Sequence, residues 1–204
     1  MNARTASKKR STKETSVFVS LDVDGSGRAE VSTGLPFFDH MLAQLARHSL
    51  MDMELMAEGD LAVDPHHTVE DTGIVLGEAF RHALGDKEGV RRFASVAVPL
   101  DEALVEVALD LSGRPYLSYA LSLPPDASPL GSPGFEPQLA EEFWRAFVVA
   151  GAVTLHVRSV SGRNTHHLVE ASFKAVALAL RDALRREGTG VPSTKGSLGS
   201  EWLG

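Results

Sequence analysis

The 204-residue sequence contains no cysteine and only two tryptophans and two tyrosines. Without cysteine the chain cannot form disulfide bonds, use a thiol nucleophile or hold an iron–sulfur cluster, and this composition fits a cytoplasmic protein. No stretch approaches about eighteen consecutive apolar residues, so no membrane span is expected. The segment Met1 to Thr15 is basic but has no apolar core, and it therefore does not resemble a secretory signal.

Positive charge is also scarce. The sequence has 20 Lys and Arg against 27 Asp and Glu, which gives a net charge of −7. This balance argues against a nucleic-acid partner, and the short basic run Lys8-Lys9-Arg10 is typical of a solvated tail. An anionic substrate would need positive charge gathered locally in its site. The length suffices for one good core or two small half-domains.

The chain does contain one segment twice. His66-His67-Thr68-Val69-Glu70 returns one hundred residues later as His166-His167-Leu168-Val169-Glu170. Eight of nineteen positions are identical between 66–84 and 166–184, whereas chance pairing would give about one. An internal duplication is the simplest account, and its matches centre on residues that bind metal ions.

Both copies show the apolar period of a helix. In each copy the first His and the Glu are four residues apart, so they lie on one helix face. The second His is rotated by about 100° from the first. Adjacent histidines arranged in this way would serve different ions, so the pattern favours two metal ions with ligands pooled from both repeats or from neighbouring subunits.

We call the two repeated segments, His66–Glu70 and His166–Glu170, the cassettes. Two residues upstream of them extend the set of candidate ligands. His40 lies twenty-six residues before His66, and Glu142 lies twenty-four residues before His166. The candidate metal ligands are therefore His40, His66, His67, Glu70, Glu142, His166, His167 and Glu170. Imidazole and carboxylate without thiolate suit manganese, iron or zinc, and the large share of carboxylate favours manganese. We expect two Mn²⁺ ions per active site, with Zn²⁺ or Fe²⁺ as alternative occupants.

The alternation of strand and helix patterns predicts an α+β fold made of duplicated half-domains, each a β-sheet with helices packed on one face. The helix faces of the two halves could pack together or against other subunits. A strand over 17–23 is expected to form a hairpin with 29–31. The expected divisions are a flexible N-terminal tail (1–13), a first half (14–90), a second half (91–187) and a C-terminal tail (188–204).

Six sequence blocks identify a family. They are Leu35–Leu42, Asp64–Asp71, Pro99–Ala103, Asp110–Tyr116, His166–Glu170 and Ser193–Gly196. In this order they resemble imidazoleglycerol-phosphate dehydratase over about 14–198. The resemblance implies a manganese-dependent lyase of histidine biosynthesis that converts imidazoleglycerol phosphate into imidazole acetol phosphate. It also implies a duplicated α+β fold assembled as a homo-oligomeric shell of 24 subunits, with active sites at subunit contacts.

The resemblance also implies residue roles. Glu14 and Glu170 would lie near the reacting carbons, and Glu14 is the preferred acid/base because Glu170 is also a metal ligand. The proposed substrate-binding residues are Glu14, Gln44, His48, Arg92, Arg114, Lys174, Ser193 and Lys195, with the C-terminal tail ordered over the phosphate as a lid. Glu142 stands where the family typically has a metal-binding His, and our hypothesis is that Glu142 binds metal through oxygen instead.

Taken without the resemblance, the ligand set allows two other functions. One is a dinuclear metal hydrolase, since the same ligands can activate water. The other is a non-catalytic assembly protein whose ions join subunits. The two remaining histidines are not candidates, because His82 is expected at the surface and His156 in a structural role.

Overall fold

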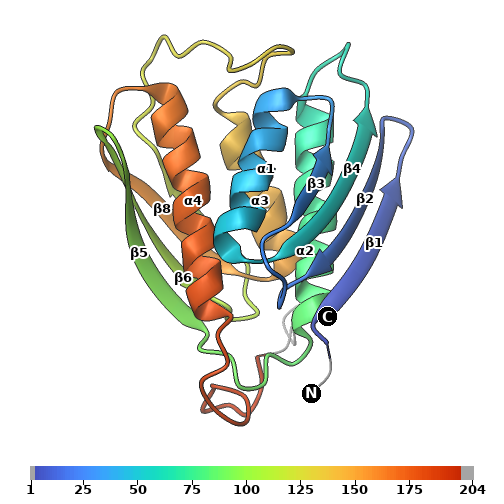
Figure 1. Ribbon diagram of the computed structural model, residues 1–204, viewed down its shortest axis with the longest axis vertical. Helices are drawn as coiled ribbons and strands as arrows, with labels where there is room; N and C mark the ends of the chain where they lie inside the picture. Colours follow the sequence, from blue (N-terminus) through green and yellow to red (C-terminus); the bar gives the residue numbers. More distant parts are fainter. Residues whose placement is uncertain (1–2, 199–204) are drawn as a thin grey trace.

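The computed structural model describes residues 3–198, in which twelve elements form two sheets and four helices (Figure 1). The first half contains β1 (Thr5–Ser11), β2 (Thr15–Asp22), β3 (Ala29–Ser32), α1 (Pro36–Ser49), β4 (Asp52–Gly59) and α2 (His66–Leu84). The second half contains β5 (Phe93–Leu100), β6 (Ala103–Asp110), β7 (Tyr116–Ala120), α3 (Leu139–Gly151), β8 (Thr154–Ser161) and α4 (Thr165–Ala183).

The two sheets have the same topology. Their strand orders are β1-β2-β4-β3 and β5-β6-β8-β7. In each sheet the first three strands in this order pair antiparallel, and the fourth pairs parallel with its neighbour. The duplication read from the cassettes therefore extends over the whole fold, and the predicted α+β class is confirmed.

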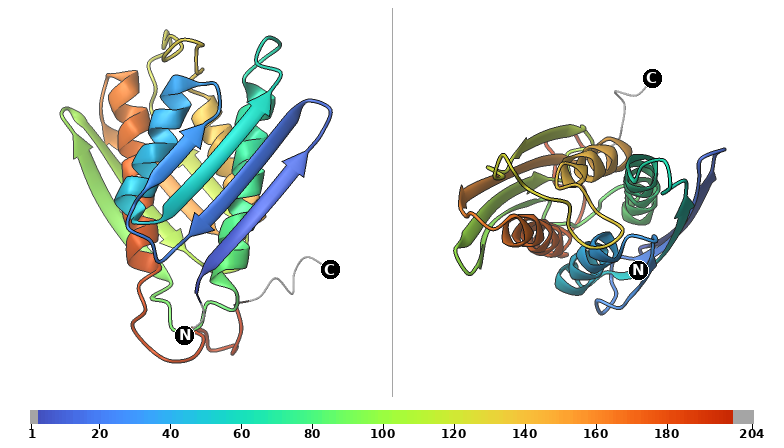
Figure 2. Two further views of the ribbon diagram at one scale, coloured as in Figure 1. Left: turned by 45° about the vertical axis from the view of Figure 1, so that its right-hand side comes forward. Right: turned by 90° about the horizontal axis from the view of Figure 1, so that it is seen from above.

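The four helices lie between the two sheets, so the molecule has a sheet–helix–sheet arrangement (Figure 2). Helix α2 covers β1 and β2, and α4 covers β5 and β6. Across the junction of the halves α1 packs on α4 and α2 packs on α3. Aromatic side chains fill this junction, with the Phe143 ring 5.3 Å from that of Phe38 and 5.5 Å from that of Phe173. Of the two alternatives for the helix faces, the structure has them packed together.

The N-terminal segment differs from the prediction. Residues 5–11, assigned from sequence to a flexible tail, form strand β1 and pair with β2 along its whole length. The expected hairpin between 17–23 and 29–31 is also wrong, because β3 lies beyond β4 at the other edge of the sheet. Polar side chains suit an exposed edge strand, so β1 lacks the apolar alternation that marks a strand in sequence.

The connection between the halves, residues 85–92, is paired with the C-terminal segment. Gly89 donates its amide to the Gly190 carbonyl, and Arg92 donates its amide to the Ala183 carbonyl. The side chain of Lys87 donates to the Leu198 carbonyl at 3.3 Å. The predicted C-terminal tail is thus held in place up to residue 198, and its remainder (199–204), like residues 1–2, lies outside the described residues. No described helix combines the length and the apolar character needed to cross a membrane.

Candidate active site

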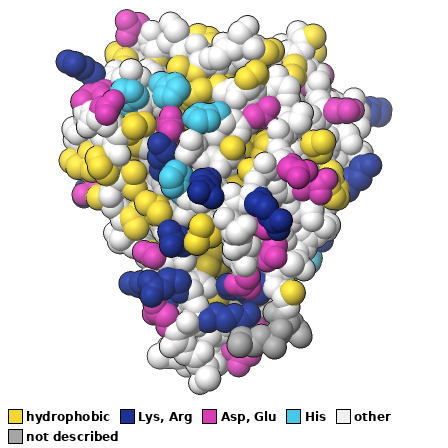
Figure 3. Space-filling view, viewed as in Figure 1, with side chains coloured by type: hydrophobic (Ala, Val, Ile, Leu, Met, Phe, Trp, Pro, Cys, Tyr) yellow, Lys and Arg dark blue, Asp and Glu magenta, His cyan; other side chains and the backbone are white. Residues whose placement is uncertain are grey.

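Glu170 is the centre of a polar group on the face shared by α1 and α4. Its Oε2 lies 2.9 Å from His166 Nε2 and 3.7 Å from His40 Nε2, and its Oε1 lies 2.6 Å from Lys174 Nζ. The spacing of the α4 residues (166, 170, 174) is four, so they form one ladder along the helix. His40 reaches them from the helix packed alongside. Histidine side chains gather over these two helices in Figure 3.

The charge state of Glu170 follows from this group. Burial acts to raise its pKa, because only 8% of the residue is exposed, but hydrogen bonds from Lys174 and His166 outweigh burial and hold the pKa below its usual range. Glu170 is therefore a carboxylate at neutral pH. It is the buried anion around which two imidazoles and one ammonium are arranged.

Gln44 connects this group to His48 along α1. Its Oε1 lies 2.9 Å from His48 Nε2, and its Nε2 lies 3.5 Å from His40 Nε2. Partial burial, followed by the charge of Lys174, lowers the pKa of His48. The lowered pKa favours the neutral imidazole of His48, whose Nε2–H donates to the Gln44 amide oxygen. The structure thus brings six of the predicted site residues together in one chain: His40, Gln44, His48, His166, Glu170 and Lys174.

The second histidine of each cassette is held by a carboxylate. His67 Nδ1 lies 3.1 Å from Asp60, and His167 Nδ1 lies 2.8 Å from Glu102. The hydrogen bond from His167, and then one from the Asn164 amide, lower the pKa of Glu102 to about 2. A ring whose Nδ1–H is held in this way presents Nε2 to a ligand, which is the usual state of a metal-binding histidine.

Glu14 stands beside the first cassette. Its Oε2 lies 3.8 Å from His67 Nδ1, and 58% of its side chain is exposed. Since Asp60 is closer to the same nitrogen, it is Asp60 that holds the ring. Glu14 is therefore a carboxylate next to the cassette that does not orient its histidine.

The remaining predicted ligands do not meet within one chain. Glu142 lies on α3, which packs on α2, and its ion-pair partner is Arg145 at 3.7 Å. Across residues 3–198, no hydrogen bond or ion pair joins Glu142 to His66 or Glu70, and no three His, Asp or Glu side chains converge closely enough to hold a metal ion.

The residues assigned to the phosphate group line one cavity at the other end of α4. Arg92, Arg114, Ser193 and Lys195 surround a space of about 630 Å³. Arg92 donates from Nε and Nη2 to the two carboxylate oxygens of Asp110, at 2.7 Å and 3.2 Å. Its Nη1 donates to the Pro192 carbonyl at 2.8 Å. Three cations, a hydroxyl and a partly fixed tail make a suitable site for an anion.

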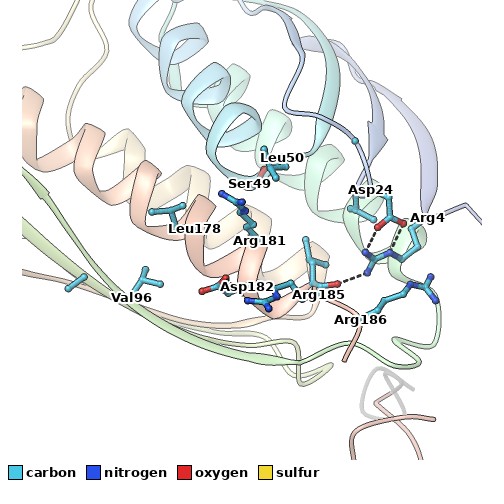
Figure 4. Close-up of a pocket in the computed structure, with 14 residues that line it drawn as sticks. Arg4, Asp24, Ser49, Leu50, Val96, Leu178, Arg181, Asp182, Arg185 and Arg186 are labelled. Carbon is cyan, nitrogen blue, oxygen red and sulfur yellow. Dashed lines mark hydrogen bonds and ion pairs between the residues drawn. The ribbon is translucent and has the colours of Figure 1, made fainter. Parts of the chain in front are cut away.

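A further cavity of about 740 Å³ contains none of the predicted site residues (Figure 4). Here Arg4 donates to Asp24 at 2.9 Å and to the Leu184 carbonyl at 3.0 Å. Arg181 and Arg185 lie in the same wall, at the carboxyl end of α4. Cations at this position complement the negative end of the helix dipole, so this cavity has a structural explanation.

The other two histidines take no part in these groups. His82 is exposed on α2 and bonds to the Glu78 carbonyl and to Lys8. His156 is exposed on β8, with its ring 5.3 Å from that of Tyr116. Sequence reasoning overlooked Asp60 and Glu102, which orient the cassette histidines. Glu102 lies inside the block Pro99–Ala103 and could have been found there, whereas Asp60 lies in a loop without a recognisable pattern.

Comparisons with known proteins identify the family of this chain. The model of the imidazoleglycerol-phosphate dehydratase family matches residues 33–180. The enzyme of that name from Acidothermus cellulolyticus is 54% identical, covering 97% of this chain and 94% of its own, and that from Gluconacetobacter diazotrophicus is 53% identical, covering 96% and 98%. The solved Staphylococcus aureus structure superposes with a TM-score of 0.79 at 36% identity over 90% of this chain and 99% of its own. The chain belongs to the imidazoleglycerol-phosphate dehydratase family.

Proposed function

We propose that the chain removes water from imidazoleglycerol phosphate to give imidazole acetol phosphate, as a metal-dependent hydro-lyase of histidine biosynthesis. The observation that carries the proposal is the group around Glu170, where one buried carboxylate meets two imidazoles and an ammonium. These donors suit a substrate with an azole ring and a leaving hydroxyl. Membership of the family, with identity above 50% over nearly the whole chain, supports the same reaction.

Two Mn²⁺ ions per active site are the proposed cofactors, and the donor chemistry fits them. His67 and His167 present Nε2 because carboxylates hold their Nδ1 atoms. The residues that would hold the ions are the eight predicted from sequence: His40, His66, His67, Glu70, Glu142, His166, His167 and Glu170. When bound, such ions supply Lewis acidity that stabilises negative charge on an azole ring. Zn²⁺ and Fe²⁺ are the alternatives that the same donors allow.

Glu14 and Glu170 are the proposed proton-transfer groups. The proton to be removed is on a carbon next to the imidazole ring, so a carboxylate must approach that carbon closely. Glu14 is suited to this role because it is beside His67 yet not consumed by a hydrogen bond to it. As the carbon–hydrogen bond breaks, its electrons form the enol double bond and the hydroxyl leaves with a proton from an acid. The enol then tautomerises to the ketone.

The substrate phosphate is assigned to the cavity of Arg92, Arg114, Ser193 and Lys195. In one chain this cavity adjoins residue 183, thirteen residues along α4 from Glu170, a separation of roughly 20 Å. The two parts of the site are therefore too far apart for one small substrate. We propose that a neighbouring copy supplies the missing part, within the homo-oligomer of 24 subunits that the resemblance implies, and we expect this assembly in the cytoplasm.

The test is to incubate the manganese-loaded protein with imidazoleglycerol phosphate and to measure imidazole acetol phosphate. We expect ketone formation that disappears on chelation and returns with Mn²⁺. Release of inorganic phosphate would instead indicate the hydrolase, and metal-dependent assembly without any product would indicate the assembly protein. Glu14→Gln should lower kcat by about 10²–10⁴-fold while preserving metal content, as expected for loss of a proton-transfer group.

A further inference from the structure

The turn that carries Glu14 is ordered by its own threonines. Between β1 and β2, the Thr12 amide donates to the Thr15 carbonyl at 2.8 Å. The Thr12 hydroxyl oxygen accepts from the amides of Glu14 and Thr15 at 3.1 Å and 3.0 Å. These bonds fix the shape of the turn. They do not fix where the turn lies relative to the cassette helix. As an edge strand, β1 forms backbone hydrogen bonds with a neighbouring strand on one side only.

Asp71 makes that second connection. Its Oδ1 accepts from Arg10 Nε on β1 at 3.1 Å, and its Oδ2 accepts from the Thr15 hydroxyl on β2. The Asp71 carboxylate is therefore hydrogen-bonded to both strands, on either side of the Glu14 turn. Asp71 is 7% exposed and directly follows Glu70 in α2, one helical turn beyond His67. The same helix thus holds the turn and carries the metal-ligand candidates.

The equivalent turn of the second half is held in a different way. Asp71 corresponds to Ala171, which is fully buried, and the β5–β6 turn carries Glu102 in the place of Glu14. Glu102 is bonded to His167 and to two backbone amides, so it is held directly. Within the part of the chain that the structure describes, the Glu14 carboxylate accepts no such hydrogen bond, and its ion-pair partner is His67 Nδ1 at 3.8 Å. In the second half the Ser161 hydroxyl also donates to the Glu102 carbonyl at 3.1 Å. Within residues 3–198, a carboxylate of the cassette helix anchors the turn only in the first half, whose turn carboxylate is not hydrogen-bonded itself.

We propose that Asp71 is a positioning residue that holds the Glu14 turn against α2, so that the Glu14 carboxylate stays beside His67. The inference rests on the proposed role of Glu14 in proton transfer. It does not require Asp71 to touch substrate or metal. Loss of the anchor would let the turn move, and a displacement of about 1 Å at a reacting group can cost about a hundredfold in rate.

The kinetic test uses Asp71→Asn and Thr15→Val, which preserve side-chain size while removing part of the anchor. We expect kcat to fall about 10- to 100-fold for Asp71→Asn, with KM and manganese content unchanged, and a smaller fall for Thr15→Val. Adding Asp71→Asn to Glu14→Gln should cost less than about twofold more, because the two residues act as one unit. An unchanged kcat, or an equal loss in both backgrounds, would overturn the inference.

Hydrogen exchange tests the geometry independently of catalysis. In Asp71→Asn, peptides covering residues 10–16 should exchange faster than in the parent protein. The control is Asp52→Asn, which removes a carboxylate bonded to Arg28 and Ser26 at the far end of β4 and should leave this turn protected and kcat unchanged. Unchanged protection in Asp71→Asn would refute the anchor whatever Glu14 does. Normal turnover of Glu14→Gln would instead refute only the proposed role of Glu14.

Discussion

The two helix pairs at the junction of the halves have the same ancestry and different uses. On α1 the residues 40, 44 and 48 are His, Gln and His, and they face Lys174 and Glu170 of α4. At the equivalent places, α3 has Glu142, Ala146 and Ala150, and α2 has Ile74 where α4 has Lys174. The α1/α4 pair thus has a polar face, whereas at these four places the α2/α3 pair has a polar side chain only at Glu142.

The helices of the α2/α3 pair are closely packed against each other. A Cβ at Gly73 would lie 2.6 Å from the Phe143 carbonyl oxygen, and one at Gly77 would lie 2.6 Å from that of Phe147. Such distances leave no space for a side chain, so the helix backbones approach as closely as they can. The two copies of the interface therefore differ: α1 and α4 carry a hydrogen-bonded polar group between them, and α2 and α3 are in close backbone contact.

The strongest test of this contrast is at Lys174. Lys174→Met should lower kcat by about a thousandfold, because a charged donor is lost beside a buried carboxylate. The equivalent change Ile74→Met in the α2/α3 pair should leave kcat unchanged. Steady-state kinetics of both variants decide the matter, and an equal effect of the two would mean that the pairs are not specialised.

Gly77→Val tests the other side of the contrast. The added methyl groups would meet the α3 backbone and the Ala150 side chain, so we expect a loss of about 3 kcal/mol in the free energy of unfolding. Gln44→Met adds no volume to a tight contact and should cost less than about 1 kcal/mol. Chemical denaturation measures both values. Equal losses would show that the α1/α4 pair is packed as tightly as α2/α3.

The two carboxylate–histidine pairs should differ in their effect on metal binding. Glu102→Gln should weaken manganese binding about 10- to 100-fold, as is usual when a partner of a metal-binding histidine is lost. Asp60→Asn should lie at the lower end of this range, since Glu14 is 3.8 Å from the same nitrogen of His67 and can take over. Competition with a chelator gives both affinities. A larger loss for Asp60→Asn would reverse this ranking.

The smallest expected difference concerns residues 87 and 187, which follow the two cassette helices. Burial lowers the pKa of Lys87 from 10.5 to about 8. Between these values the unfolded chain binds more protons than the folded chain, so the free energy of unfolding should rise with pH by about 1 kcal/mol per unit. Lys87→Met should remove this rise, and Glu187→Gln, at an exposed position, should not. Denaturation at pH 7.5 and pH 9.5 provides the measurement.

Much of the fold could be predicted because its signals are local. The cassette helices and α1 carry apolar residues at helical spacing, and the matching His and Glu residues reveal the duplication. Strand β1 could not be predicted, because six of its seven residues are polar and it is held by pairing with β2. Backbone pairing uses groups that every residue carries, so it leaves no side-chain pattern in the sequence of an edge strand.

The residues of the candidate site could largely be predicted, but the residues that hold them in place could not. His166, Glu170 and Lys174 follow from helical spacing on one helix. The family resemblance points to Gln44 and His48, and to Arg92 and Lys195 for the anion cavity. Two supporting residues were not predictable. Asp60 is only seven residues from His67 but lies in a loop without a recognisable pattern, and Asp71 acts on residues far away in the sequence. Asp71 meets Arg10 at a separation of 61 residues. A carboxylate that orients another side chain has no fixed distance from it in the sequence, so no sequence pattern reveals it.

The crossed packing of α1 on α4 and α2 on α3 makes each half depend on the other. A single half would leave the apolar faces of both its helices exposed, so it could not have been stable alone. Two identical halves related by a two-fold axis would bury the same faces, each first helix lying on the second helix of its mate. The packing of this chain is thus that of a symmetric dimer of halves, and their fusion through residues 85–92 makes the two equivalent helix contacts independent in sequence, so that one can change without the other.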